Sequence, residues 1–138
     1  NSPLVINTYD NAIRYNAEGF WPRLIPNPSQ LNETSYLYTA DHGETLAENG
    51  EWWLHGGNSQ QEARVPIILI TKRPLTVEPA YEASHFNLFP TLLDLMAFPP
   101  AERPHAYPLS LLEATAADAT PRYFLGGNNE RVLFLWEN

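Results

Sequence analysis

Several carboxylates and two histidines lie within one short stretch of this 138-residue chain, residues 39–57. Asp41 and His42 come just after the apolar run at residues 36–38, with two residues between, and such a run is typical of a buried strand. In open α/β sheets, ligands bind beyond the carboxyl ends of the strands, and a carboxylate beside a neutral imidazole is a good pair of zinc ligands. Gly43 permits a sharp turn after the pair. The pattern makes Asp41 and His42 candidate zinc ligands, with His55 near the same strand end.

The same residue types also fit a turn without chemistry. After a strand, an Asp that caps a turn and a surface histidine would give the pair Asp41 and His42. His55 is then an ordinary loop histidine. Glu44 has two interpretations, as a hydrogen-bond partner that orients His42 or as a charge at a helix N-terminus that the helix dipole favours.

The wider sequence around the pair carries a family pattern. Residues 41–50 read DHGETLAENG, and residues 54–56 read LHG. This stretch closely resembles the metal-binding segment of the phosphoethanolamine transferases, which belong to the alkaline phosphatase and sulfatase superfamily. In that family the segment reads much like SDHGESLGENG, then an aromatic residue, then LHG. Thr45 stands here for the family's second Ser, and the spacing before LHG is one residue longer.

Flanking segments extend the resemblance on both sides. Residues 9–15 look like the family's YDNSI-type helix, and residues 65–70 look like the VPMI-type strand after the metal segment. Residues 84–95 look like the late helix, which reads SHxNLFxTLLxL in the transferases and DxxPTLLDL in the sulfatases. The match therefore runs over residues 9–96, and no family pattern is visible after it.

The resemblance implies metal-dependent phosphoryl transfer. In the family a Thr nucleophile attacks a phosphodiester, and zinc activates that Thr and stabilises the developing charge. The resemblance implies that Asp41 and His42 bind this zinc, with a Glu and the Thr from earlier in the domain. It implies that His55 is catalytic, at the substrate phosphate or at a second zinc.

The resemblance also implies substrates and a location for the parent protein. A phospholipid donor and a glycan or lipid acceptor, such as lipid A or another envelope glycan, would be its partners. The parent would lie in the inner membrane with its catalytic domain facing the periplasm, and this chain itself carries no readable address.

We expect residues 1–138 to be the C-terminal portion of a single sulfatase-like catalytic domain. The family's nucleophile and first acidic ligand precede the matching segment, and nothing before Tyr9 supplies them. Thr8 and Thr34 lack the expected context. We therefore expect the isolated chain to be inactive without the N-terminal half of the domain.

Two other functions stay open. The PTLLDL helix leans toward a sulfatase-type ester hydrolase, or a phosphoglycerol transferase, of the same superfamily, with Ca²⁺ or Mn²⁺ in place of Zn²⁺. The third hypothesis is a non-catalytic binding domain derived from such an enzyme.

The amino-acid composition excludes several classes of protein and of metal site. A hydrophobic fraction of 43% fits a folded globular chain, and a net charge of −8 argues against a nucleic-acid surface, which needs clustered Lys and Arg. Without cysteines, neither a disulfide nor a thiolate metal site can form. No apolar run approaches the ~20 residues of a membrane helix.

The elements that must position the site alternate between helix and strand. We expect the end of a strand or an extended lead-in at residues 4–7, and an amphipathic helix over 9–20 that Thr8 or Asp10 caps. Further expected elements are strands at 35–40 and 65–71, helices at 44–48, 84–96 and 109–117, and a hairpin of 122–125 with 131–136.

This alternation predicts an α/β fold. We expect a partial alkaline-phosphatase-like sandwich, in which helices flank a mostly parallel sheet covered on both faces and a β-hairpin closes the C-terminus. An exposed sheet edge would allow self-association with a second copy.

Overall fold

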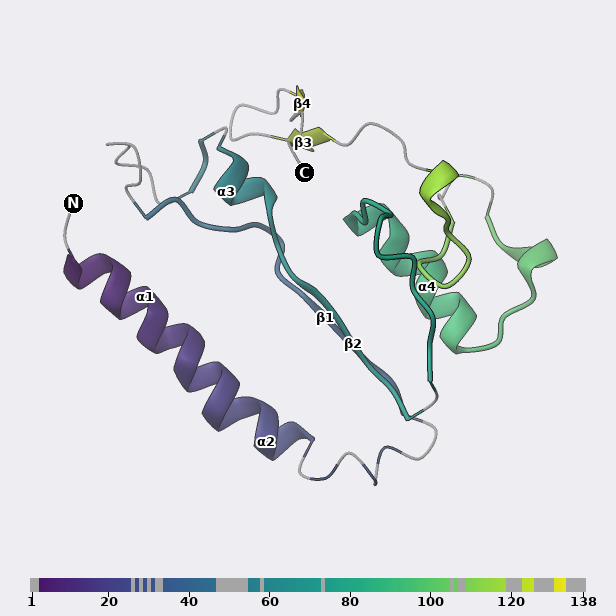
Figure 1. Ribbon diagram of the computed structural model, residues 1–138, viewed down its shortest axis with the longest axis horizontal. Helices are drawn as coiled ribbons and strands as arrows, with labels where there is room; N and C mark the ends of the chain where they lie inside the picture. Colours follow the sequence, from purple (N-terminus) through teal and green to yellow (C-terminus); the bar gives the residue numbers. More distant parts are fainter. Residues whose placement is uncertain are drawn as a thin grey trace. The chain divides into compact units, whose positions relative to one another are not determined.

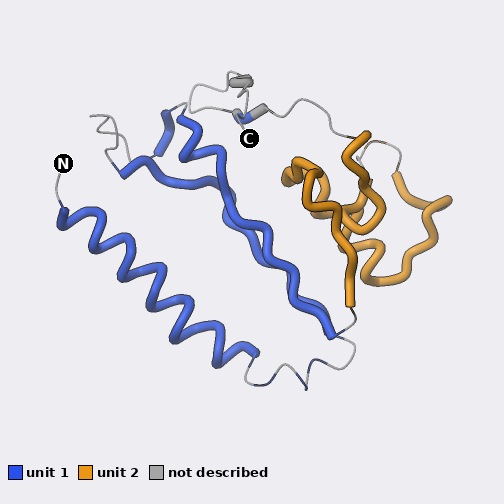
Figure 2. Tube along the Cα trace, in the orientation of Figure 1, with its two compact units in different colours: residues 1–72, 124–138 blue, residues 73–123 orange. Residues whose placement is uncertain are grey.

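The computed structural model divides the chain into two compact units (Figure 2). The first unit is Asn1–Lys72 with Phe124–Asn138, and the second is Arg73–Tyr123. The described residues are 3–25, 27, 29, 31, 34–46, 55–57, 59–72, 74–104, 106, 109–118, 123–125 and 131–133.

The first unit opens with one continuous helical rod (Figure 1). It consists of α1 (Pro3–Tyr15), the π-helical segment η1 (Asn16–Phe20) and α2 (Trp21–Leu24). Proline is favoured at a first helical position because it needs no hydrogen-bond partner for an N–H, and Pro3 starts α1. The π-helical turn lies just before Pro22, which could not donate into a regular helix.

The extended lead-in predicted for residues 4–7 is wrong, because these residues lie inside α1. Their apolar, β-branched character suggested an extended chain, but intrinsic propensity is a weak prior that a long helix overrides. Thr8 is not a cap. Its hydroxyl donates to the carbonyl oxygen of Leu4 at 2.7 Å, one turn back in the same helix.

The predicted strands both form, as β1 (Tyr36–Thr39) and β2 (Ile67–Ile70). They pair antiparallel, with Tyr36 opposite Ile70 and Thr39 opposite Ile67. The prediction of a mostly parallel sheet is therefore not confirmed. Parallel neighbours need a long crossover, usually a helix, and the described residues between these strands hold only the four-residue α3 (Gln60–Ala63).

The strand pair is half-exposed in this structure. Tyr38 and Ile68 lie directly opposite each other, and both side chains are exposed. An edge-to-face contact joins Trp21 of α2 to Tyr38, with ring centroids 5.0 Å apart. This contact joins the helical rod to β1. Because Tyr38 and Ile68 are nevertheless exposed, the described part of the sheet is not covered on both faces as expected.

The second unit is built around the predicted late helix. It begins as a 3₁₀ turn, η4 (His85–Asn87), and continues as α4 (Leu88–Leu95). Ser84 is its N-cap residue, and the Ser84 backbone N–H donates to Asn87 Oδ1 at 2.8 Å. Pro90 explains the change of helix type, because an α-helix that starts at Leu88 places Pro90 in the first turn, where no N–H is needed.

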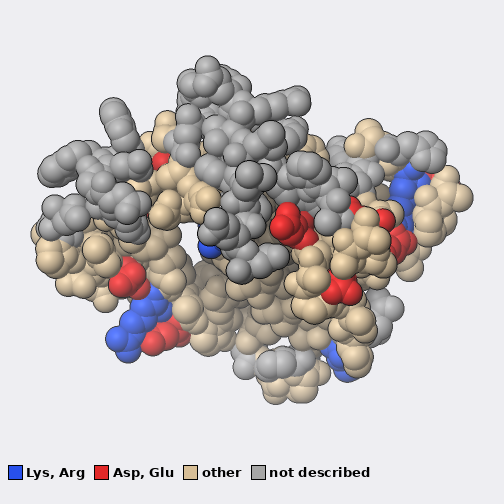
Figure 3. Space-filling model, turned by 45° about the horizontal axis from the view of Figure 1, so that its top comes forward, with Lys and Arg blue, Asp and Glu red and all other residues tan. Residues whose placement is uncertain are grey.

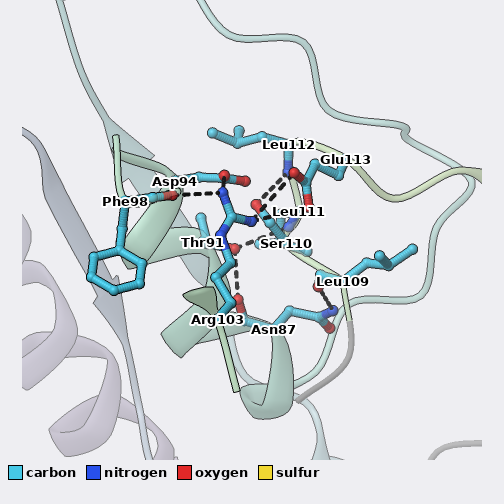
Figure 4. A network of polar contacts seen from close by, with 10 residues as sticks. All are labelled: Asn87, Thr91, Asp94, Phe98, Arg103, Leu109, Ser110, Leu111, Leu112 and Glu113. Carbon is cyan, nitrogen blue, oxygen red and sulfur yellow. Dashed lines mark hydrogen bonds and ion pairs between the residues drawn. The ribbon is translucent and has the colours of Figure 1, made fainter. Parts of the chain in front are cut away.

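Buried polar groups tie the following segment to α4 (Figure 4). Asn87 is fully buried, and its Nδ2 donates to the Tyr81 hydroxyl at 2.9 Å and to the Leu109 carbonyl at 2.7 Å. Thr91, also fully buried, accepts from the Leu111 N–H at 3.0 Å. These bonds anchor residues 109–111 on the helix.

A partly buried ion pair completes this unit. The Arg103 guanidinium contacts Asp94 of α4 and reaches Glu113 at 3.2 Å (Figure 4). Around it lie η5 (Pro100–Glu102) and η6 (Ala116–Asp118). The helix predicted at 109–117 is wrong, because those residues form a single turn on Ser110 followed by η6.

The C-terminal strands form as β3 (Tyr123–Leu125) and β4 (Arg131–Leu133), which pair in a second two-stranded sheet. This fits the predicted hairpin. Its turn and the last residues of its second strand lie outside the described residues.

Candidate functional site

The predicted metal ligands lie directly after β1. Asp41 is exposed and folds back on its neighbour, since its Oδ1 accepts from the His42 backbone N–H at 3.1 Å. Its other oxygen, Oδ2, lies 3.8 Å from His42 Nε2. Asp41 Oδ2 and His42 Nε2 are therefore close enough to each other to bind the same metal ion.

The His42 ring is held in one tautomer. Its Nδ1 lies 2.8 Å from the Gly43 carbonyl oxygen. A carbonyl can only accept, so Nδ1 carries the hydrogen and the neutral ring keeps its lone pair on Nε2. The hydrogen bond to Gly43 raises the pKa of His42 above its usual value, and the negative charges of Asp41, Glu44 and Glu62 raise it further.

His55 lies beside His42, with ring centroids 5.5 Å apart. Its Nδ1 is 3.6 Å from Glu44 Oε1, an ion-pair distance when the ring is protonated. Glu44 is not a helix N-terminal charge, because residues 44–46 are not helical, and residues 47 and 48 of the helix predicted there lie outside the described residues. Its second oxygen, Oε2, is buried without a hydrogen-bond partner in the described structure.

Gly43 is required by a close backbone approach. Its N–H donates to the Glu62 carbonyl at 2.8 Å, and a Cβ on it would lie 2.1 Å from the Gln61 carbonyl oxygen. The turn after the two ligands is thereby pressed against α3. On the other side, Gly56 follows His55 with a φ of 85°, a left-handed conformation that glycine adopts without strain.

The sequence analysis missed three residues behind the site, Thr45, Ser59 and Glu62. Glu62 is only 1% exposed, and its Oε1 accepts from the Thr45 hydroxyl at 3.2 Å and the Gly57 N–H at 3.1 Å. Ser59 caps α3 by accepting from the Glu62 N–H at 3.2 Å. A Ser followed three residues later by Glu is the capping-box pattern, so the sequence did indicate Ser59 and Glu62 as a pair at a helix start.

The donor set fits part of a zinc site. Zinc ligands at about 2.0–2.2 Å in a tetrahedron lie about 3.4 Å from one another, close to the 3.8 Å between Asp41 Oδ2 and His42 Nε2. The fixed Nδ1 hydrogen of His42 is what an imidazole ligand usually has. Zinc sites need three or four ligands, and the described residues hold no group of three or more His, Asp or Glu side chains that could hold a metal.

Two surface observations complete the description of the molecule. On the face drawn in Figure 3, Lys and Arg side chains do not gather into one patch. Within the described part of the chain, no helix combines the length and the apolar character that crossing a membrane requires.

Comparisons with known proteins agree with the sequence pattern. The Sulfatase family model matches residues 4–98. The chain is 31% identical over 100 residues to phosphatidylethanolamine transferase Mcr-1 of Escherichia coli, a match that covers 66% of this chain. The chain spans only 18% of that protein's length. No solved structure matches significantly.

Proposed function

The chain belongs to the sulfatase family, a family of enzymes, and on that premise we propose that Asp41 and His42 bind zinc in a phosphoethanolamine transferase-type centre. One observation carries the proposal. The Gly43 carbonyl fixes the hydrogen of His42 on Nδ1, and Nε2 then lies 3.8 Å from Asp41 Oδ2. A surface turn without a ligand would have no need of this arrangement.

Each residue has a distinct part in the proposed reaction. Asp41 would supply an anionic ligand, and His42 a neutral one held by its bond to Gly43. When bound, zinc would lower the pKa of a hydroxyl nucleophile and polarise phosphoryl oxygens. His55, 5.5 Å from His42 between ring centroids, would contact the transferred phosphate or bind a second metal ion, and Glu44 would hold it there.

We propose a phospholipid donor and an envelope glycan or lipid acceptor, such as lipid A, for the complete protein. The similarity to a phosphatidylethanolamine transferase supports this choice of donor. We place the complete protein in the inner membrane with this domain facing the periplasm. The isolated chain should not turn over substrate, because its described residues hold no group of three or more side chains that could bind one metal ion and a catalytic zinc site needs three.

A sulfatase-type hydrolase or phosphoglycerol transferase is the second candidate. The family model that matches the chain is the Sulfatase model, and it covers α4 with its PTLLDL sequence. Ca²⁺ or Mn²⁺ would then be the metal, and its site would favour oxygen donors. A preference of the chain for Ca²⁺ or Mn²⁺ over Zn²⁺ would favour this candidate.

Zinc binding by the purified chain tests the proposal. We would titrate Zn²⁺ into the chain and into Asp41→Ala, His42→Ala and a control, His85→Ala, whose histidine lies in the second unit. We expect each ligand variant to lose at least about tenfold in affinity, since even residues that only orient a ligand contribute that much. The control should bind as the parent does. Equal binding by all four proteins would refute the zinc assignment and favour a non-catalytic binding domain. No binding by any of them would show that two ligands are too few, and the same variants of the complete protein would then decide.

A further inference from the structure

Glu62 is an unusual residue for its position. It lies on the four-residue α3, yet only 1% of it is exposed. Carboxylates are rarely buried this fully unless they are paired. Among the described residues its side-chain hydrogen bonds go to neutral groups, its Oε2 is buried without a hydrogen-bond partner, and its charge acts on His42 through space. Burying a carboxylate in this way lowers the stability of the fold. A function of Glu62 would explain why this cost is tolerated.

The contacts of Glu62 reach both histidine-bearing segments. Its Oε1 accepts from Thr45, three residues after His42, and from the Gly57 N–H, two residues after His55. Its backbone carbonyl accepts from Gly43, next to His42, at 2.8 Å. One residue therefore holds the turn after β1 on one side and the glycine loop on the other.

The hydrogen bonds around Glu62 form a closed ring. A carboxylate only accepts, so Thr45 gives its one hydroxyl hydrogen to Glu62 Oε1. The Ser59 hydroxyl must then donate to Thr45, across 2.9 Å, while it accepts from the Glu62 N–H. Such rings polarise each member and are stiffer than single bonds.

Capping of α3 does not account for the buried carboxylate. Ser59 already caps the helix through its own hydroxyl. The packing is also close, since a Cβ on Gly57 would lie 3.0 Å from Glu62 Oε1. The side chain thus fixes where the backbone after His55 runs.

We propose that Glu62 is a positioning residue that sets the 5.5 Å separation of the His42 and His55 rings. It does so through its acceptor oxygen, which joins the two segments that carry the rings. The inference rests on the proposed function for what the histidines bind, but the ring separation itself can be measured without metal.

The test compares Glu62→Gln with Glu62→Met by NMR of the metal-free chain. Glutamine keeps the acceptor oxygen, whereas methionine keeps the length and offers only a weakly accepting sulfur. The readouts are the cross-relaxation between the two imidazole rings and the exchange rate of the Gly57 amide. We expect Glu62→Gln to keep both, and Glu62→Met to lose the ring contact and speed Gly57 exchange at least about tenfold.

Defined outcomes decide the proposal. Retention of the ring contact in Glu62→Met, or its loss in a folded Glu62→Gln, would overturn it. If Glu62→Met does not fold, Thr45→Val and Thr45→Ser decide. The valine removes one donor to Oε1 and the serine keeps it, so loss in valine alone supports the proposal and retention in valine overturns it. Zinc titration of the same variants separately tests the proposed function, because it can fail while the ring contact behaves as expected.

Discussion

Replacing Gly43 with Ala should destabilise the first unit by about 1–3.5 kcal/mol. The new Cβ would lie 2.1 Å from the Gln61 carbonyl oxygen and 3.0 Å from that of Arg64, and both are backbone atoms that cannot rotate away. Real Cβ atoms essentially never approach closer than 3.0 Å, so the turn and α3 must part by roughly 1 Å.

The magnitude follows from what this shift breaks. The bond from the Gly43 N–H to the Glu62 carbonyl is 2.8 Å long and would stretch beyond bonding range, a loss of about 1 kcal/mol. Residual overpacking costs typically ~1–3 kcal/mol. Against these terms, alanine restricts the unfolded chain and returns about 0.4–1 kcal/mol.

Gly19→Ala is the matched control. Its Cβ would lie 3.9 Å from the Tyr15 ring, an ordinary contact, in the helical rod of the same unit. The effect on the unfolded chain is the same, so the difference between the two variants isolates the contact in the folded state. Gly19→Ala should stabilise by about 0.5–1 kcal/mol.

Urea unfolding followed by tryptophan fluorescence measures both variants. All four tryptophans belong to the first unit, so the signal reports the part of the chain that holds Gly43. A midpoint for Gly43→Ala equal to or above that of Gly19→Ala would refute the close approach of the turn to α3.

Three further predictions concern other parts of the chain. Ala97→Gly should stabilise by about 1 kcal/mol in thermal unfolding, because Ala97 directly follows the C-cap of α4 with a φ of 57°; unchanged stability would contradict that conformation. Arg103→Met should destabilise by about 1.5–3 kcal/mol in urea, because it removes the charged hydrogen-bond partner of the partly buried Asp94; adding Asp94→Leu to that variant should recover much of the loss. The raised pKa of His42 means that its bond to the Gly43 carbonyl favours the protonated folded state. The stability difference between the parent chain and His42→Gln should therefore be fully present below about pH 6.5 and fall as pH rises through the folded pKa, and a pH-independent difference would contradict it.

Local chemistry made some elements predictable from sequence. Ser84 and Asn87 indicate the start of the late helix, and the apolar run at residues 67–70 predicts a strand. The family resemblance in residues 9–96 is confirmed by the Sulfatase match, and it drew attention to the turn at Asp41. These signals are short-range, so a single sequence is enough to show them.

Strand direction could not be predicted in the same way. The apolar runs of β1 and β2 are compatible with either pairing, and direction depends on the path of the chain between them. The prediction of an extended segment at residues 4–7 failed for a related reason. The β-branched side chains there only weakly oppose a helix that continues through them. The role of Glu62 required knowledge that residues 45, 57 and 62 meet in space.

Buried, hydrogen-bonded polar residues hold the candidate site in place more than an apolar core does. In the first unit, the buried residues among those described are Leu31, Thr45 and Glu62, and two of the three belong to the hydrogen-bonded ring behind the histidines. The strands beside them keep exposed faces at Tyr38 and Ile68. Apolar contacts tolerate small shifts, whereas hydrogen bonds weaken steeply with distance and angle. A site that must hold two imidazoles at a set separation is therefore better fixed by Glu62 than by the strand pair, even though burying the carboxylate costs stability.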